Sequence, residues 1–445
     1  MLRSFRLGNH KSFAEEQELL LMPAQPGDKR PVVPVTAIYG ANASGKSNLL
    51  DGLAFMQRAV TNSFARWEVD EGVTRNPFRL CADGGDAASV FVVDLIVDNI
   101  PYTYGFTLND DEIREEWLYS YPKKRERKLF ERDGDEIRFS STIDDIKAKL
   151  ELVESLTRPN SLFLSAIAQT RLEPLMPVYR WFKSQLLMRP SGYYPFSTRI
   201  ADRINSSILH SPENRKRFVA LLQAADIGIT DLHIEETTDP ELSVELGTTE
   251  ELIENKEAAF SQASPAEKEK IKSEFERLHR RRDVLSRRVH QRRMELKLEY
   301  GTTSFSLGDE SAGTVSWLQL LPMVLEALDS GQVVVVDEID TSLHPLLTTQ
   351  LIGLFKDAET NPNGAQLIFT THDASLLGTI LDDEALERDQ VWFVEKDTDG
   401  ASSLYPLTDF KPRKEHNREL RYLGGSYGAV PVLDHQDFAE AVLRR

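Results

Sequence analysis

The 445-residue sequence has a single cysteine, Cys81, which excludes a disulfide framework and a cysteine-based zinc site. It has no run of 18 apolar residues, which excludes an ordinary transmembrane helix. Its first residues lack an apolar signal core, so we expect a cytoplasmic protein without membrane association. Basic residues number 53 against 71 acidic ones, and the net charge of −18 argues against a surface that binds nucleic acid over its whole extent.

Two neighbouring segments nevertheless carry opposite charge. Residues 231–257 contain ten acidic residues and one basic residue, whereas residues 265–300 contain twelve basic and seven acidic residues. The apolar positions of the basic segment fit a helical seam, which predicts a long helix or a short coiled-coil arm that starts at Ser264-Pro265. Three interpretations stay open for it: a solvated helix face, a partner-protein contact, or nucleic-acid contacts through Arg281, Arg288 and Arg293.

The rest of the chain suggests two or three domains at the usual size of a domain. Residues 90–140 form short apolar runs separated by turn residues, which predicts an antiparallel meander. Helical patterns follow through residues 150–225. We therefore expect one lobe over 1–185, a helical or coiled-coil-like insertion over 186–300, and a second lobe over 301–445.

One segment matches the G-x-x-x-x-G-K-S pattern of a phosphate-binding loop in full. It lies between an apolar strand, Val35–Tyr39, and a helical pattern over residues 47–55. Its glycines let backbone N–H groups surround phosphate oxygens, and the helix N-terminus adds its positive end. We expect Lys46 to bind the β- and γ-phosphates and Ser47 to bind Mg²⁺. The predicted nucleotide-binding residues are Gly40, Asn42, Ala43, Ser44, Gly45, Lys46, Ser47 and Asn48.

Two further apolar strands end in residues suited to nucleotide hydrolysis. Four valines, Val333–Val336, precede Asp337 and Glu338, and an apolar run over 367–371 precedes His372. Open α/β sheets bind ligands at the carboxyl ends of their strands, so we expect both ends near the phosphate-binding loop. Asp337 would then orient Mg²⁺ through water, Glu338 would polarise the attacking water, and His372 would reach the γ-phosphate.

These motifs, in this order, resemble those of ABC-type ATPases of the SMC, RecF and OLD-like branch. Residues 5–13 are similar to the first strand of that branch and its N-x-K-S-F turn, and Glu-Ser-Ala-Gly-Thr at 310–314 is similar to its signature element. The signature departs from the Leu-Ser-Gly-Gly-Gln of transporter ATPases, and His344 replaces the usual aspartate of the D-loop. Both departures, with residues 116–119 and 421–431, resemble bacterial abortive-infection ATPases of the RloA or AbiL type.

The resemblance implies an α/β fold: a P-loop ABC-type ATPase head with a mixed central sheet, an antiparallel β-lobe and a helical insertion. We expect the phosphate-binding-loop strand and Val333–Val336 to lie side by side in that sheet. The resemblance also implies a homodimer or larger homo-oligomer in which two heads enclose ATP and Mg²⁺. The residues that it assigns are Gln169, Glu338 and His372 for catalysis; Ser47, Gln169 and Asp337 for the metal; and Ser311, Gly313, Ser342 and His344 for contact with the nucleotide of the other copy.

Four functions follow from these observations. The first is an ATPase sensor or scaffold of an anti-phage system, which controls a separate nuclease or toxin effector, since the tail beyond His372 looks too short for a fused Toprim nuclease. The second is a DNA-binding repair ATPase like RecF. A transporter subunit is disfavoured by the signature. A nuclease is disfavoured because the sequence contains no further carboxylate cluster. Asp397-Thr398-Asp399 is followed by Gly400 and is more typical of a hairpin turn than of a metal site.

Overall fold

The computed structural model contains two compact units, residues 1–192 with 323–445 and residues 193–322. It describes residues 1–69, 71–80, 87–170, 172–189, 204, 208–209, 211–237, 240–262, 274–275, 277–286, 293–380, 383–410, 417–431 and 440–443. Cys81 lies outside this set. No helix in the described ranges combines the length and the apolar character needed to span a bilayer.

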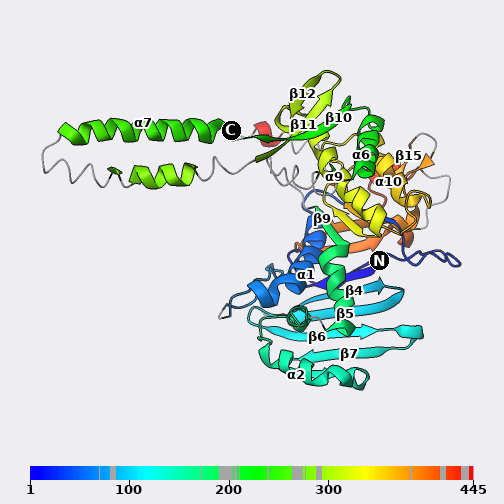
Figure 1. Cartoon of the computed structure of the whole chain (residues 1–445). Coiled ribbons are helices and arrows are strands. Elements are labelled where there is room, and N and C mark those ends of the chain that lie inside the picture. The colour runs from blue at the N-terminus through cyan, green and yellow to red at the C-terminus, as the bar shows by residue number, and fades with distance from the viewer. Residues whose placement is uncertain are drawn as a thin grey trace. The chain divides into compact units, whose positions relative to one another are not determined.

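The first unit is mixed α/β and contains two large sheets (Figure 1). The antiparallel sheet has the order β2-β1-β4-β5-β6-β7-β8. Its strands are β1 (Leu2–Gly8), β2 (Gln17–Leu20), β4 (Ser89–Val97), β5 (Ile100–Leu108), β6 (Ile113–Ser120), β7 (Arg127–Asp133) and β8 (Glu136–Phe139). The meander predicted over residues 90–140 is confirmed, because β4 to β8 pair in sequence.

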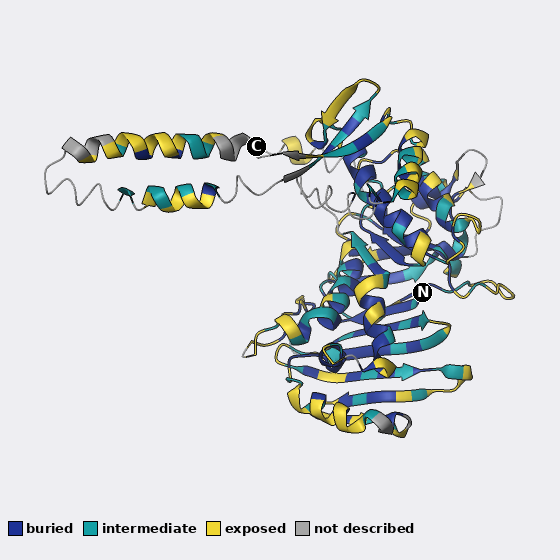
Figure 2. Cartoon of the chain, viewed as in Figure 1, coloured by how far each residue is buried: buried dark blue, intermediate teal, exposed yellow. Residues whose placement is uncertain are grey.

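The second sheet carries the candidate site and has the order β18-β17-β3-β14-β13-β9. Its strands are β3 (Val35–Tyr39), β9 (Leu186–Arg189), β13 (Val333–Val336), β14 (Gln366–Thr370), β17 (Val391–Lys396) and β18 (Ser402–Pro406). All neighbours pair in parallel except β17 and β18, which form a hairpin. Every residue of β3, β13 and β14 is buried (Figure 2), as expected for central parallel strands.

Helix α1 (Lys46–Arg66) follows β3 and belongs to the large core of this unit, with buried residues such as Leu49, Leu53 and Met56. The same core contains residues of both sheets, for example Ile38 and Tyr104, and of the short helices α2 (Lys147–Leu156), α3 (Phe163–Ile167) and α4 (Met176–Arg180). The unit also contains α10 (Pro345–Lys356) and α11 (Arg418–Leu423).

Two expectations for this unit are wrong. Strands β3 and β13 are not side by side, because β14 lies between them and pairs with both. Helix α10 connects β13 to β14, and a parallel crossover of this kind places its second strand directly beside the first. The helical pattern expected from residue 150 onward is also interrupted by β9, which extends the parallel sheet beyond β13.

The second unit combines helices with a small antiparallel sheet of order β10-β11-β12. Its elements are α6 (Pro212–Ala224), β10 (Asp231–Thr237), α7 (Pro240–Gln262), β11 (Arg293–Tyr300), β12 (Thr303–Ser306) and the start of α9 (Ala312–Ser330), which continues into the first unit. Residues 277–286 are helical and lie beside α7 in Figure 1. Ile253 of α7 and Leu285 are buried in this region.

The predicted helix over 265–300 is wrong at its C-terminal end. Residues 293–300 form β11, and residues 293–299 of it pair with β10. The local pattern explains this result, because Met294, Leu296, Leu298 and Tyr300 alternate with charged residues at the period of a strand. Only the described helical residues within 274–286 agree with the prediction, and the proposed start at Ser264-Pro265 lies outside the described residues.

Candidate nucleotide-binding site

The loop between β3 and α1 has the geometry of an anion-binding turn. Ala43 and Gly45 have positive φ angles of 62° and 116°, and Gly45 immediately precedes the first turn of α1. A Cβ at Gly40 would collide with the carbonyl oxygen of Val394, and a Cβ at Gly45 would collide with the hydroxyl of Ser402. Gly40 is therefore required by close backbone approach and Gly45 by its positive φ and the neighbouring hydroxyl, and the loop ends at a helix N-terminus suited to phosphate.

Hydroxyl groups from distant parts of the chain form hydrogen bonds that hold this loop in place. The Ser402 Oγ lies 2.5 Å from the carbonyl oxygen of Ser44 and 2.8 Å from the Oγ of Ser12. The Asn48 side chain donates to the same Ser12 oxygen at 2.7 Å. Ser12 and Ser402 are buried, so these bonds are shielded from water. The N-terminal segment and strand β18 thus fix the loop on one side.

Lys46 is the buried cation of the site, with only 6% of its surface exposed. Its Nζ donates to the carbonyl oxygens of Gly40 at 2.8 Å and Ala41 at 3.1 Å. Burial lowers the pKa of the Lys46 ammonium, although the carboxylates of Asp337, Glu338 and Asp340 oppose this shift. The ammonium is therefore positioned over the loop and surrounded by groups that favour its charged form.

The acidic pair follows β13 directly and is tied to the end of β14. The Thr370 hydroxyl donates to Asp337 Oδ1 at 2.6 Å and accepts the backbone N–H of Glu338 at 2.7 Å. Glu338 has a φ of 52°, which is uncommon for a residue with a side chain. Its carboxylate lines the pocket, whereas Asp337 is 8% exposed and does not line it.

His372 follows β14 and is positioned by the turn after β13. Its backbone N–H donates to Asp340 Oδ2 at 3.1 Å. Burial, followed by the charge of Lys46, lowers the pKa of the His372 imidazole, while Asp340, Glu338 and Asp337 oppose the shift. A lowered pKa favours the neutral imidazole, which offers one ring nitrogen as donor and one as acceptor.

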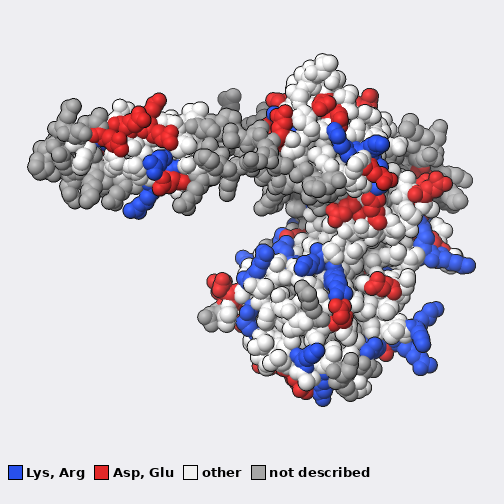
Figure 3. Space-filling view, viewed as in Figure 1, with Lys and Arg blue, Asp and Glu red and all other residues white. Residues whose placement is uncertain are grey.

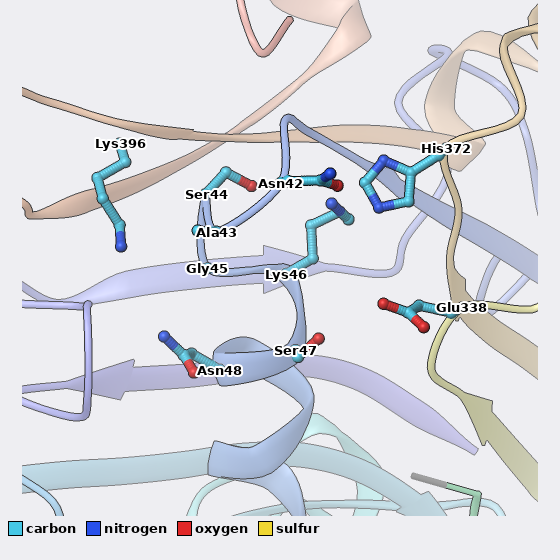
Figure 4. Close-up of a pocket in the computed structure, with 10 residues that line it drawn as sticks. All are labelled: Asn42, Ala43, Ser44, Gly45, Lys46, Ser47, Asn48, Glu338, His372 and Lys396. Carbon is cyan, nitrogen blue, oxygen red and sulfur yellow. The ribbon is translucent and has the colours of Figure 1, made fainter. Parts of the chain in front are cut away.

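These elements enclose a pocket of about 500 Å³ (Figure 4), which falls within the usual range for ligand sites. Figure 4 shows the Lys46 ammonium close to the His372 ring, and the Glu338 carboxylate across the pocket from Ser47. The lining residues are Asn42, Ala43, Ser44, Gly45, Lys46, Ser47, Asn48, Glu338, His372 and Lys396. The pocket therefore contains seven of the eight predicted loop residues together with Glu338 and His372.

Lys396 was missed by sequence reasoning. It is the last residue of β17, which pairs with β3 beside the phosphate-binding loop, and it faces the Asn48 side of the pocket in Figure 4. The only available signal was a basic residue at the end of an apolar run that follows the His372 strand. Asp397-Thr398-Asp399 forms the turn after it, since the Asp397 carboxylate accepts the backbone N–H groups of Asp399 and Ala401.

The remaining predicted residues lie outside this pocket. Gln169 is exposed at the end of α3, where its backbone N–H donates to Ala166. Ser342 is exposed with a φ of 69°, and His344 caps α10 through Nδ1, which accepts from the backbone N–H of Leu346 at 3.2 Å. Ser311 caps α9 in a similar way through Thr314 at 3.1 Å. Ser311 is exposed and Gly313 is half-exposed, so both are accessible at the start of that helix.

The basic residues proposed for nucleic-acid contact belong to the second unit. Arg281 forms an ion pair with Glu245 of α7, and Lys256 of α7 forms another with Glu274. The acidic and basic segments thus pair with each other within an antiparallel helical arm. Arg288 and the side chain of Arg293 lie outside the described residues.

Comparison with known proteins identifies the family. Residues 35–378 match a family model described as "AAA domain, putative AbiEii toxin, Type IV TA system". The chain belongs to this family. The match runs from β3 to the segment just after His372 and therefore includes every strand end that contributes to the pocket except that of β17.

Solved structures with a similar fold are head domains of SMC proteins. One is an SMC head bound to the C-terminal winged-helix domain of ScpA, at 13% identity and a TM-score of 0.39, covering 91% of this chain and 96% of that one. Another is the SMC head domain from Thermotoga maritima, at 14% identity and a TM-score of 0.38, covering 91% and 98%. No curated protein matches the sequence.

Proposed function

We propose that the chain hydrolyses ATP to ADP and phosphate. The observation that supports this most directly is the meeting of three strand ends in one pocket: the loop after β3, Glu338 after β13 and His372 after β14. Backbone N–H groups of the loop and the Lys46 ammonium would bind the phosphates. Glu338 would hold the attacking water and accept its proton, and neutral His372 would orient the γ-phosphate from the other side.

The residues around the pocket fit a magnesium ion. The described residues contain no cluster of three or more histidine, cysteine or carboxylate side chains that could hold a metal by themselves. Mg²⁺ needs no such cluster, since it keeps several waters and binds through one or two carboxylates and the substrate phosphates. The Ser47 hydroxyl, which lines the pocket, and the Asp337 carboxylate, which does not line it and would act through water, are the oxygen donors that we assign to the ion. Bound there, the ion would neutralise charge that develops on the phosphates.

Replacing Glu338 by glutamine tests this reaction. The amide cannot accept the proton of the water, so turnover should fall by about 100-fold or more, the usual contribution of a general base. Nucleotide affinity should stay close to that of the parental protein, because Glu338 does not contribute to the phosphate-binding loop. Phosphate release and equilibrium ATP binding measure the two quantities separately. A Glu338→Gln protein with parental turnover would contradict the assignment of this residue.

We further propose that each site is completed by a second copy of the chain. The support is that Ser311 and Gly313 are accessible at the start of α9, as a shared site requires. Mixing two inactive variants tests the idea. Lys46→Ala and Ser311→Arg should each abolish turnover alone, while an equal mixture should recover about a quarter of the parental rate by random pairing into two-fold dimers. A mixture without recovery would favour a site contained within one chain.

The proposed role is that of a sensor or scaffold subunit in an anti-phage system, with a separate nuclease or toxin as effector. The family description refers to a toxin–antitoxin system, which supports a function that depends on a second component. Co-expression with the product of the adjacent gene, followed by native mass measurement with and without ATP, tests this role. A partner-free protein whose deletion leaves phage sensitivity unchanged would contradict it.

Nucleic-acid binding is the second candidate function, and a loop of the antiparallel sheet supports it. The β6–β7 connection contains Lys123, Lys124 and Arg125, all exposed. The backbone N–H groups of Lys124 and Arg125 donate within the turn, to Tyr121 and Pro122, and among the described residues no ion pair involves the three side chains. Figure 3 shows Lys and Arg side chains gathered at this end of the sheet. DNA affinity should then decrease steeply with salt, and reversing these three charges should reduce the salt slope by about 3. An unchanged slope would exclude this loop.

A further inference from the structure

The Thr370 hydroxyl lies between the two acidic residues of the site and bonds to both of them. It is fully buried at the end of β14, one strand away from the residues that it contacts. We propose that Thr370 is a positioning residue for the hydrolysis proposed above, on which this inference rests. It orients the Asp337 carboxylate and holds the backbone of Glu338 in its left-handed conformation.

The bond to Asp337 determines the rotation of that carboxylate. A threonine hydroxyl has one proton, and in this structure it is directed to Asp337 Oδ1 at 2.6 Å. Both side chains are shielded, with Thr370 at 0% and Asp337 at 8% exposure, so water does not compete strongly for the bond. The second carboxylate oxygen remains outside this bond and is the one that we assign to the metal.

The bond to Glu338 holds a backbone conformation that is unfavourable by itself. The N–H of Glu338 donates to the Thr370 hydroxyl at 2.7 Å, and the next N–H, that of Ile339, donates to the Thr370 carbonyl at 3.0 Å. A residue with a side chain keeps a φ of 52° only where its surroundings enforce it. Thr370 therefore holds the turn at two consecutive residues, and the turn directs the Glu338 carboxylate into the pocket (Figure 4).

A valine at position 370 would keep the shape and remove both bonds of the hydroxyl. Asp337 Oδ1 would lose its donor, and the Glu338 N–H would lose its acceptor. A serine would keep the hydroxyl and remove only the methyl group. Thr348 of α10 offers a matched control, because it is equally buried and its hydroxyl has no hydrogen-bond partner among the described residues. Thr348→Val therefore changes the same atoms at a position that the mechanism does not use.

The experiment compares Thr370→Val, Thr370→Ser and Thr348→Val by turnover, ATP binding and hydrogen exchange of the Glu338 amide. In Thr370→Val we expect kcat to decrease by about 10- to 100-fold, the usual effect of a residue that orients a metal ligand. The KM for ATP should change by less than about twofold, since no phosphate-binding group is altered. The Glu338 amide should exchange faster. Thr370→Ser should restore both properties, and Thr348→Val should match the parental protein.

Several outcomes would overturn the proposal. One is parental turnover or parental Glu338 exchange in Thr370→Val, and another is a Thr370→Ser protein as impaired as the valine variant, which would indicate packing of the methyl group. If Thr370→Val does not fold, the kcat and the Glu338 amide exchange of Thr370→Ser test the proposal. Parental values support it, and impaired values contradict it. If the parental protein itself hydrolyses no ATP, the proposed function fails, whereas the exchange measurement, which needs no turnover, still tests the bond to Glu338.

Discussion

Lys46 lies in the glycine-containing loop of the pocket, and Arg281 lies in the charged helical arm. Both are basic residues, but their surroundings differ. Lys46 is almost fully buried and faces two carbonyl oxygens and the open pocket. Arg281 is more than half exposed, and its charge is matched by Glu245 on the neighbouring helix. The comparison teaches that a basic residue indicates an anion site where it borders a pocket, as Lys46 does, and not where a neighbouring helix supplies its carboxylate, as Glu245 does for Arg281.

The largest effect on this comparison should come from Lys46. Replacing it by alanine removes a buried ammonium that donates to the phosphates, and charged hydrogen bonds of this kind contribute enough to lower ATP affinity by about 10- to 100-fold. Isothermal titration with ATP measures the loss. Parental affinity in Lys46→Ala would remove the phosphate-binding loop from the proposed site.

Lys396 should have a smaller effect on the same measurement. Its side chain is exposed at the rim, so solvent screens its interaction with a phosphate, and Lys396→Ala should weaken ATP binding by about two- to fivefold. Lys396→Arg should retain most of the affinity, because it keeps the positive charge. If alanine and arginine both bind ATP as tightly as the parental protein, the β17–β18 hairpin supports the loop only through Ser402.

The pH dependence of turnover tests the state of His372. Burial and Lys46 lower the pKa of this imidazole below its usual value of 6.5, so protonation requires a lower pH than in an ordinary histidine. Turnover that depends on the neutral imidazole should therefore fall to half only below pH 6.5, with a gradual decrease on either side of that midpoint. A midpoint above pH 6.5 that is absent in His372→Asn would show that the pKa is raised instead.

Local motifs made the centre of the site predictable from the sequence. Gly40, Lys46, Glu338 and His372 each lie within a few residues after the end of an apolar strand, so a short stretch of sequence contains both the strand and the residue that it positions. Lys396 and Thr370 gave no such signal. Their roles depend on which strands are neighbours: β14 lies beside β13 through the α10 crossover, whereas β17 lies beside β3 through pairing over a long separation in sequence.

In the arm, the spacing of apolar residues fits both a helix and a strand, and the helical interpretation was wrong at its C-terminal end. Leu296 fits the helical seam of residues 271–296 and also the strand alternation of residues 294–300, and pairing with β10 decided in favour of the strand. The sequence shows the opposite charges of residues 231–257 and 265–300. It does not predict the ion pairs within the arm, because these depend on the packing of α7 against the helical residues 277–286.

The smallest effect should come from the arm itself. Arg281→Glu places two carboxylates together but leaves both exposed, so the free energy of unfolding should decrease by no more than about 1 kcal/mol. ATP affinity should be unchanged, and so should the salt dependence of any DNA binding, because the arginine already has a carboxylate partner. Chemical denaturation and DNA binding at several salt concentrations measure these quantities. Arg281→Glu could instead reduce the salt dependence of DNA affinity as strongly as reversal of Lys123, Lys124 and Arg125. Pairing with an acidic neighbour would then not prevent an arginine from contacting phosphate. The distinction between pocket and arm would fail.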